Sequence, residues 1–359
     1  MKMKVMIAAG GTGGHIYPGI AVANEILRRD PSSEVLFVGT SRGLETKIIP
    51  ENGFQLALIH SVGLKNVGLK GKVKGLMTLP RSFVEARRLL REFRPSVVVG
   101  AGGYVSGPVL MMAVVMGVPT LVMDSNALPG FTNRRLARYV DRAALTFHEA
   151  LPFFGKKGTV TGNPVRKEFF DVKPKERNGD TSVLIFGGSQ GARAINNAMI
   201  AALDDLNGSR ETMHVVHQTG EADFEKVRNA YTGHGWESAD VRPYISDMMH
   251  EFERADILIC RAGATTCAEI AAAGKAAIMI PLPTAADDHQ RKNAEAMQNA
   301  GAAKMIVQDE LSPEVLASTL IELAAEPETI ARMEQAARNL AREDAAEATV
   351  DIIEELARD

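Results

Sequence analysis

The sequence predicts an α/β protein with two doubly wound parallel sheets, and three observations support that prediction. Short, almost uninterrupted apolar runs alternate with amphipathic segments along the chain. Strands of this kind are buried on both faces, as in parallel sheets that helices cover. The pattern of strand, glycine loop and helix that opens the chain starts again near residue 182. The length of 359 residues also favours two domains, at roughly 150 residues each.

The first half supplies the elements of one sheet. The apolar run Val5–Ala9 ends in glycines, and an amphipathic helix is expected over Pro18–Arg29. Further strands are expected over Glu34–Gly39, Val97–Gly100 and Pro119–Met123. The charge-free stretch 95–123 has the length of a membrane span, but glycines and prolines interrupt it. It therefore predicts a strand, a loop, a helix and a strand.

The second half repeats the arrangement. A strand is expected over Ser182–Phe186, and a helix over Ala192–Leu206 with Ile195, Met199, Ala202 and Leu206 on one face. The strands that follow are expected over Met213–His217, Ile257–Cys260 and Ala277–Pro281. The polar, proline-bearing stretch Lys173–Thr181 predicts the break between the sheets. Residues Ile330–Asp359 are helical by composition, with an acidic end.

Composition excludes several classes of protein. Hydrophobic residues make up 45% and charged residues 24% of the chain, which excludes a disordered protein. The net charge of −3 argues against a globally basic nucleic-acid binder. Two cysteines, Cys260 and Cys267, cannot build a disulfide framework, which favours a reducing compartment. The apolar run near the N-terminus is too short for the core of a signal peptide.

One segment, residues 64–94, is strongly basic. It holds nine basic and two acidic residues, interleaved with apolar side chains. The functional interpretation is a patch that lies on an anionic membrane surface, where each cation contributes ~1 kcal/mol. The alternative is a solvated loop followed by a surface helix. Composition alone weighs these two interpretations equally.

Glycine-rich loops follow the first strand of each half. The loop Gly10–Gly14 opens the first helix, where backbone N–H groups can approach an anion. A dinucleotide fingerprint would need glycine at Ile16 and an acidic residue after the second strand, where Thr40 stands. NAD and FAD are therefore disfavoured, and no glycine loop ends as a Walker A motif does. The equivalent second loop is Gly187–Gly191. Two such loops at strand ends favour a ligand site over two simple turns.

Several polar residues near strand ends have competing interpretations. His15 follows the first loop, and an imidazole suits general base catalysis. Thr266 and Glu269 fit a capping box, although Glu269 could also bind the vicinal hydroxyls of a ribose. The segment Asp287–Gln290 could suggest a metal, but a solvated loop is the commoner outcome, and no metal is assigned.

Five longer motifs stand in one order over nearly the whole chain. They are Gly10–Pro18 (GGTGGHIYP), Gly102–Pro108 (GGYVSGP), Thr161–Arg166 (TGNPVR), Gly187–Arg193 (GGSQGAR) and Cys260–Ala271 (CRAGATTCAEIA). Together they resemble the MurG family of peptidoglycan N-acetylglucosaminyltransferases. The resemblance implies the GT-B architecture, with two Rossmann-like domains that face each other across a cleft.

The resemblance also implies how the domains divide the work. Residues 1–164 would bind the acceptor and the membrane, residues 165–340 would bind UDP-GlcNAc, and helix 341–359 would pack back on the first domain. Donor contacts would come from Arg166, Ser189, Ile245, Ala264, Thr265, Thr266, Cys267, Ala268, Glu269 and Gln290. Thr12, Gly13, Gly14 and Asn126 would line the cleft from the first domain. Glu269 would bind the ribose hydroxyls, and Ile245 would present backbone groups to the uracil.

The implied reaction is a single inverting displacement. GlcNAc would pass from UDP-GlcNAc to the C4 hydroxyl of MurNAc in undecaprenyl-pyrophosphoryl-MurNAc-pentapeptide, lipid I, giving lipid II and UDP. His15 is the first candidate for the base and Asp124 the second. Where the family often has His-Glu-Gln-Asn, this chain has Met123-Asp124-Ser125-Asn126. The N–H groups after Gly188, with Arg166, would stabilise the departing pyrophosphate.

The partners and the location follow from the same resemblance. No cofactor is implied, and the partners would be the two substrates and an anionic membrane surface, without nucleic acid. The protein would lie peripherally on the cytoplasmic side of the cell membrane, which favours the functional interpretation of residues 64–94. It would serve peptidoglycan synthesis, and through it cell-wall biogenesis, cell shape, cell division and the cell cycle. The alternatives are a GT-B enzyme for another lipid acceptor such as diacylglycerol, a UDP-sugar epimerase, or a non-catalytic UDP-sugar sensor.

Overall fold

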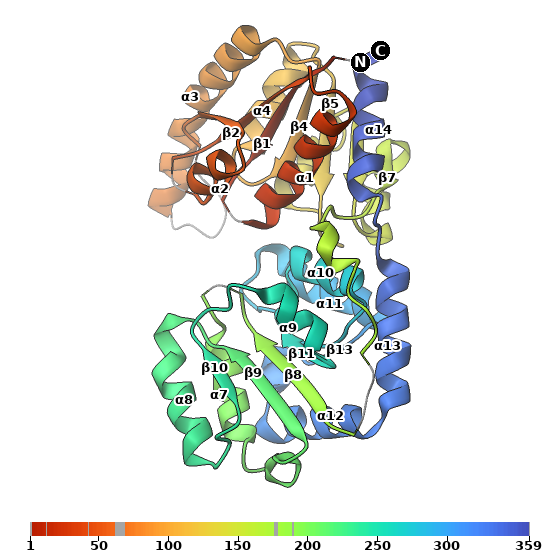
Figure 1. Cartoon of the computed structure of the whole chain (residues 1–359). Coiled ribbons are helices and arrows are strands. Elements are labelled where there is room, and N and C mark those ends of the chain that lie inside the picture. The colour runs from red at the N-terminus through yellow and green to blue at the C-terminus, as the bar shows by residue number, and fades with distance from the viewer. Residues whose placement is uncertain are drawn as a thin grey trace. The chain divides into compact units, whose positions relative to one another are not determined.

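The computed structural model of the chain has two compact units, and the second is inserted into the first. The first unit comprises Met1–Val165 and Arg342–Asp359, and the second comprises Arg166–Ala341. Figure 1 follows the chain through both. The structure describes residues 2–11, 13–41, 43–61, 69–175, 179–188 and 190–358, with the backbone alone for residues 69–77 and 286.

The first unit is built on a parallel sheet of seven strands in the order β3-β2-β1-β4-β5-β6-β7. The strands are β1 (Lys4–Ala9), β2 (Glu34–Gly39), β3 (Gln55–Leu58), β4 (Val97–Gly102), β5 (Thr120–Asp124), β6 (Arg142–Leu145) and β7 (Gly158–Val160). The helices are α1 (Gly13–Arg29), α2 (Glu45–Glu51), α3 (Leu69–Phe93), α4 (Ser106–Val115), α5 (Phe131–Leu136), α6 (Leu151–Phe154) and α14 (Ala345–Arg358).

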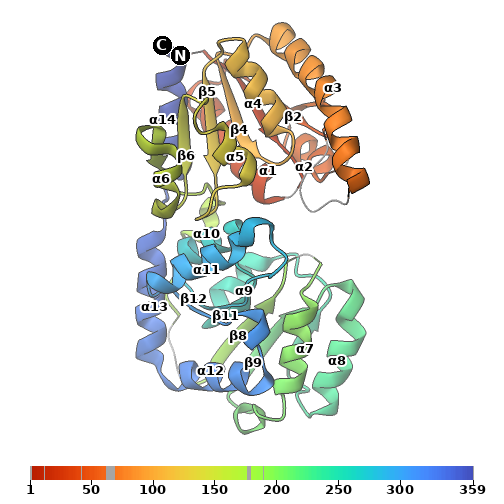
Figure 2. The ribbon, with the colours of Figure 1, turned by 180° about the vertical axis from the view of Figure 1, so that it is seen from behind.

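Helices cover both faces of this sheet. Alternate residues of β1 therefore belong to two different buried clusters. Val5 and Ile7 belong to a buried cluster with residues of α1 and α14, on the side seen in Figure 1. Met6 and Ala8 belong to a second cluster with residues of α3 and α4, on the side seen in Figure 2. This burial on both faces explains why the central strands are almost entirely apolar.

The second unit repeats the design with six parallel strands in the order β10-β9-β8-β11-β12-β13. The strands are β8 (Thr181–Phe186), β9 (Met213–Gln218), β10 (Asp240–Arg242), β11 (Ile257–Cys260), β12 (Ala276–Met279) and β13 (Ala303–Met305). The helices are α7 (Arg193–Ala202), α8 (Phe224–Gly233), α9 (Met248–Arg254), α10 (Ala264–Ala273), α11 (His289–Asn299), α12 (Pro313–Ala325) and α13 (Pro327–Leu340). Each sheet therefore has the Rossmann strand order, whose direction reverses between β1 and β4 and between β8 and β11.

The expected strands are confirmed to within one or two residues at each end. The charge-free stretch 95–123 forms β4, α4 and β5, as expected. The first helix begins at Gly13, so Pro18 lies inside it and does not start it. The expected helical region Ile330–Asp359 consists of two helices, which are separated between Leu340 and Ala345.

The polar stretch Lys173–Thr181 is predicted to separate the two units, but this prediction is wrong. The second unit begins earlier, at Arg166. The reason is that the intervening residues already belong to the second core. Phe169 is buried there, with its ring centroid 5.2 Å from that of Phe252. Val172 is buried as well, and its carbonyl accepts a hydrogen bond from Arg338 of α13.

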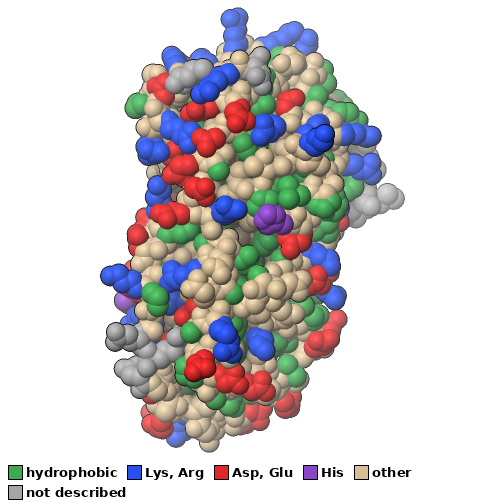
Figure 3. Space-filling model, turned by 90° about the vertical axis from the view of Figure 1, so that its right-hand side faces the viewer, with side chains coloured by type: hydrophobic (Ala, Val, Ile, Leu, Met, Phe, Trp, Pro, Cys, Tyr) green, Lys and Arg blue, Asp and Glu red, His purple; other side chains and the backbone are tan. Residues whose placement is uncertain are grey.

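The C-terminal helix α14 is fastened to α1 by a cluster of charges. Arg29 lies 2.6 Å from Asp351, 3.3 Å from Glu354 and 2.7 Å from Glu25. Figure 3 shows the side of the molecule that carries α14, where acidic and basic side chains lie next to one another. Among the described helices, none is both long and apolar enough to cross a membrane.

Candidate active site

The first glycine loop joins β1 to α1 above a buried carboxylate. Glu45 is fully buried, and its Oε2 accepts a hydrogen bond from the Gly11 N–H over 2.9 Å. Its Oε1 accepts hydrogen bonds from the N–H and the hydroxyl of Thr40, over 2.9 and 2.7 Å. Burial alone would raise the pKa of Glu45, but these hydrogen bonds outweigh it and lower the pKa. A charged carboxylate therefore ties the ends of β1 and β2 together.

His15 is the third residue of α1 and lies against the loop that follows β4. A β-carbon at Gly102 would come within 2.2 Å of His15 Nδ1. A β-carbon at Gly103 would come within 2.2 Å of the Gly10 carbonyl oxygen. Both glycines also have positive φ angles, of 122° and 83°. The loops on the two sides of the reversal point thus meet, and glycine permits that contact.

Asp124, the second candidate base, is fully engaged in holding its own loop. Its Oδ1 accepts a hydrogen bond from the Asn126 N–H over 3.0 Å. Its Oδ2 accepts from the Gly130 N–H over 3.0 Å and from the Asn133 side chain over 2.8 Å. Burial raises the pKa of Asp124, against the opposing effect of these hydrogen bonds. The geometry gives Asp124 a structural role, which places Asn126 at the carboxyl end of β5.

The second glycine loop precedes α7, whose first turn has no side-chain cap. The Gly188 carbonyl accepts a hydrogen bond from the Gly191 N–H over 2.9 Å. A β-carbon at Gly191 would lie 1.8 Å from the Thr219 carbonyl oxygen, so the loop rests directly on the backbone after β9. The uncapped N–H groups of α7 can bind an anion. Thr12 and Ser189, two of the expected binding residues, lie outside the described residues.

Of the two interpretations of Thr266 and Glu269, the capping box is wrong. The N-cap of α10 is Gly263, and it makes no side-chain cap. Thr266 is the third residue of the helix and Glu269 the sixth, which is too far along for a capping box. Burial raises the pKa of Glu269 to about 7, against the attraction of the Arg166 guanidinium. Since no hydrogen bond engages this carboxylate within the described chain, it is available to a ligand.

Of the remaining expected donor residues, Arg166 precedes the first strand of the same unit, and Ile245 and Gln290 follow strand ends. Arg166 is exposed, with its guanidinium 4.9 Å from the centre of the Phe169 ring. Ile245 follows β10, and its N–H donates to the Gln218 Oε1 over 2.7 Å. Gln290 lies in α11 after β12, and its Oε1 accepts a hydrogen bond from the Leu282 N–H over 3.0 Å. The topology thus brings Ile245, Gln290 and Ala264–Glu269 to one edge of the sheet, and Arg166 acts there through its charge on Glu269.

Comparison with known proteins assigns the chain to a family. Residues 5–145 match the N-terminal domain of glycosyltransferase family 28, and residues 182–353 match its C-terminal domain. A protein of Myxococcus xanthus named UDP-N-acetylglucosamine–N-acetylmuramyl-(pentapeptide) pyrophosphoryl-undecaprenol N-acetylglucosamine transferase is 47% identical, over 99% of this chain and 93% of that protein. The chain belongs to the MurG family. A protein of the same name from Syntrophus aciditrophicus is also 47% identical, over 98% of each chain.

Solved structures agree with this assignment. The crystal structure of MurG from Acinetobacter baumannii has a TM-score of 0.83 and 31% identity, and covers 98% of this chain and 99% of that one. A UDP-GlcNAc 2-epimerase from Neisseria meningitidis has a TM-score of 0.71 at 14% identity, over 98% of this chain and all of that one. The epimerase therefore shares the fold alone. The α/β architecture with two Rossmann-like domains is that of the MurG family and of GT-B enzymes.

In each unit of this MurG-family chain, one residue that holds the loops at the carboxyl ends of the strands was not predicted from the sequence. Glu45 stands in no motif, and its partner Gly11 is 34 residues away. Gln218 ends β9, and its partners are Gly188 and Ile245, at separations of 30 and 27 residues. A polar residue at the end of a buried strand is the one local signal that could have indicated Gln218.

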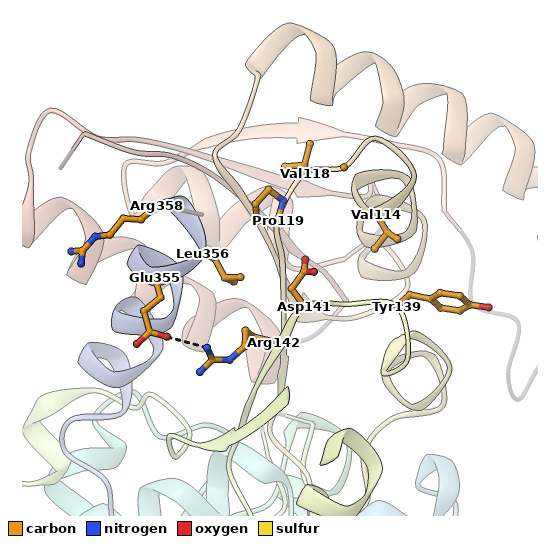
Figure 4. Close-up of a pocket in the computed structure, with 10 residues that line it drawn as sticks. Val114, Val118, Pro119, Tyr139, Asp141, Arg142, Glu355, Leu356 and Arg358 are labelled. Atoms are coloured by element: carbon orange, nitrogen blue, oxygen red, sulfur yellow. Dashed lines mark hydrogen bonds and ion pairs between the residues drawn. The ribbon is translucent and has the colours of Figure 1, made fainter. Parts of the chain in front are cut away.

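A separate hollow of about 740 Å³ lies at the opposite edge of the first sheet. Its lining includes Pro119 and Arg142, at the beginning of β5 and β6. In Figure 4 the side chains of Arg142 and Glu355 point toward each other, and they lie 3.0 Å apart. Ligands of open α/β sheets bind at the carboxyl ends of the strands. The hollow is therefore distinct from the candidate active site.

The basic segment 64–94 falls only partly within the described chain. Residues 62–68, among them Lys65, lie outside it, as do the side chains of residues 69–77. In the described part of α3, Arg81 and Arg88 pair with Glu85 and Glu92. Arg87 and Arg91 are exposed. Among the described residues, no group of three or more histidine, cysteine or acidic side chains could hold a metal ion.

Proposed function

We propose that this chain transfers GlcNAc from UDP-GlcNAc to the C4 hydroxyl of MurNAc in undecaprenyl-pyrophosphoryl-MurNAc-pentapeptide, which gives lipid II and UDP. The observation that carries the proposal is the 47% identity to a transferase of this name, which spans 99% of the chain. The carboxyl edges of both sheets support it, because each presents a glycine loop at the point where nucleotide-binding folds take their ligands.

The second unit is the donor-binding part in this proposal. The uncapped start of α7 would receive the pyrophosphate, together with Arg166 and Ser189. Ala264, Thr265, Thr266, Cys267, Ala268 and Glu269 would surround the ribose and the sugar, with Gln290 and Ile245 beside them. The unengaged Glu269 carboxylate supports its role, since a carboxylate can accept hydrogen bonds from two vicinal hydroxyls.

The first unit would bind the acceptor and supply the base. The C4 hydroxyl attacks the anomeric carbon as its proton passes to His15, the bond to the UDP oxygen breaks, and the configuration inverts. His15 is the better candidate because the Asp124 carboxylate already accepts three hydrogen bonds. The positive charge of Arg166 and the N–H groups of α7 would stabilise the leaving pyrophosphate. Thr12, Gly13, Gly14 and Asn126 would bind substrate from this unit.

We place the enzyme peripherally on the cytoplasmic face of the cell membrane, where its lipid-linked acceptor would be found. The exposed Arg87 and Arg91 of α3 support contact with anionic lipids. Val84 lies on the same helix with 69% of its surface exposed, which adds an apolar group to this face. The described part of the helix thus combines the two kinds of side chain that bind membrane surfaces.

The decisive experiment incubates the protein with UDP-GlcNAc and synthetic lipid-linked MurNAc-pentapeptide. A product heavier by one N-acetylhexosamine residue is expected, with one UDP released for each transfer. Diacylglycerol replaces the acceptor in a second reaction, and a third contains no acceptor. Product on diacylglycerol alone would indicate a different lipid glycosyltransferase. Free sugar or an epimer without acceptor would indicate an epimerase, and binding without turnover would indicate a sensor.

A further inference from the structure

The side chain of Gln218 connects two segments that no strand pairing joins. Its Nε2 donates to the Gly188 carbonyl over 2.9 Å, and its Oε1 accepts from the Ile245 N–H over 2.7 Å. The residue is 2% exposed, so both groups have left water. A buried amide with both ends paired is costly to disturb, because each lost partner leaves an unsatisfied polar group.

The end of β9 that carries Gln218 is itself firmly held. The preceding residue, His217, lies 3.1 Å through its Nε2 from the Asn196 Oδ1 of α7. The Asn196 side chain also donates to the carbonyl of Thr219, the residue after Gln218, over 2.9 Å. Helix α7 therefore fixes the strand on both sides of Gln218. The Gln218 amide therefore keeps its position even if one of the two segments that it binds moves.

In the proposed function the two segments bind different parts of the donor. Gly188 belongs to the glycine loop that would hold the pyrophosphate, and Ile245 is the residue that would face the uracil. One rigid amide therefore sets the separation between the phosphate site and the base site. A nucleoside diphosphate must satisfy both sites at once, whereas a nucleoside alone occupies only one of them.

We propose that Gln218 is a positioning residue that couples the pyrophosphate loop to the nucleobase loop and so fixes the site to the length of a uridine diphosphate. The inference rests on the proposed donor, UDP-GlcNAc. Gln218 need not touch the ligand for this role, because it acts through the backbone of Gly188 and Ile245. A residue with a purely structural role would affect the affinity for every ligand of the second unit equally.

Two variants at this position separate the two hydrogen bonds. Gln218→Glu keeps an oxygen for the Ile245 N–H but, when ionised, cannot donate to the Gly188 carbonyl. Gln218→Met keeps the volume and removes both hydrogen bonds. Calorimetry at pH 8 measures the affinities of wild type and variants for UDP and for uridine. Fluorescence of Trp236, the single tryptophan of the chain and a buried residue of the same unit, verifies that each variant is folded.

We expect Gln218→Glu to weaken UDP binding about 10-fold or more and to change uridine binding less than about twofold. Gln218→Met should weaken both ligands. Lowering the pH to about 5.5 should narrow the difference in UDP affinity between wild type and Gln218→Glu, since a buried glutamic acid that gains a proton can donate again. Wild type gives the reference for ionisation of UDP itself.

A parallel loss of UDP and uridine affinity in Gln218→Glu would overturn the inference, and so would unchanged affinities in Gln218→Met. Both results leave the proposed function intact, because wild type still binds UDP. If wild type binds neither UDP nor uridine, the proposed function is overturned instead. The two failures are thus distinguishable in one set of titrations.

Discussion

Gly102 lies so close to His15 that a β-carbon there would come within 2.2 Å of the imidazole Nδ1. Gly102 is the last residue of β4 and His15 lies in the first turn of α1, so the close approach determines where the imidazole can lie. Gly102 also has a φ angle of 122°, which side chains other than glycine rarely adopt. The position of the proposed base is therefore set by the absence of a side chain.

Replacing Gly102 by alanine should displace the imidazole and reduce kcat at least tenfold, because a shift of about 1 Å can cost 10²-fold in rate. The affinity for UDP should not change, since the donor residues belong to the second unit. Gly117→Ala is the matched control. Gly117 also has a positive φ angle, of 69°, but no atom lies within 4 Å of the added carbon. Equal losses of activity in both variants would show that backbone strain alone is responsible.

His15→Ala should lower kcat about 10²- to 10⁴-fold, the usual contribution of a general base. The KM for UDP-GlcNAc should remain near that of wild type, because the imidazole is assigned to the acceptor side. Steady-state rates with purified lipid acceptor measure both parameters. Near-full turnover of the variant would remove His15 from the role of base.

Glu45→Gln should destabilise the first glycine loop. The carboxylate accepts three hydrogen bonds, and a carboxamide would turn an NH₂ group toward an N–H donor. One unsatisfied buried group costs about 1–3 kcal/mol. The expected result is a lower thermal midpoint and a raised KM for the acceptor, with UDP affinity unchanged. Thr40→Val, which removes only the hydroxyl contact, should have a smaller effect on both, and the reverse order would contradict the assignment.

Binding of uridine should strengthen as the pH rises through about 7. The pKa of Glu269 is raised to about 7 by burial, so the free protein carries much of this side chain protonated at pH 6. A ribose diol donates hydrogen bonds to the charged carboxylate, so a protonated Glu269 must lose its proton before it can bind the diol in this way. Titration of uridine at pH 6 and pH 8 avoids ionisation of a phosphate. Glu269→Gln should bind weakly at both values, and an equally steep pH dependence in that variant would assign the effect to another group.

The second unit should lose stability below about pH 6.5. Burial lowers the pKa of His217 to about 3, whereas the unfolded chain has an ordinary imidazole. Between the pKa of the folded state and that of the unfolded state, only the unfolded state binds a proton. The free energy of unfolding therefore decreases as the pH is lowered, by up to about 1.4 kcal/mol per pH unit. Urea unfolding followed by Trp236 fluorescence measures it. His217→Gln should lack this part of the pH dependence, and identical slopes in the two proteins would contradict the prediction.

Much of the fold follows from local patterns in the sequence, because the central strands of these sheets are buried on both faces. An apolar run such as Val183–Phe186 therefore marks a central strand directly. The edge strands β3 and β10 are only partly buried and carry polar residues, among them Gln55 and Asp240. They lack that signal, and no strand was expected at either position.

The candidate site was less accessible to local reasoning. The strand ends that carry His15, Ile245 and Glu269 could be expected from the resemblance. The contacts that position them could not, since Glu45 and Gln218 act on residues about 30 positions away. The capping box at Thr266 failed because Gly263, earlier in the same loop, adopts the N-cap position. Sequence spacing alone does not reveal which residue a helix begins with.

The return of α14 to the first unit makes that unit dependent on both ends of the chain. Val350, Ile352, Ile353 and Leu356 complete the core beside α1, and Arg29 holds the helix through Asp351. During synthesis, residues 1–165 therefore emerge from the ribosome before α14, because the whole inserted unit lies between them along the chain. The first unit therefore cannot complete its core until the inserted unit has been synthesised, which separates the folding of the two units in time.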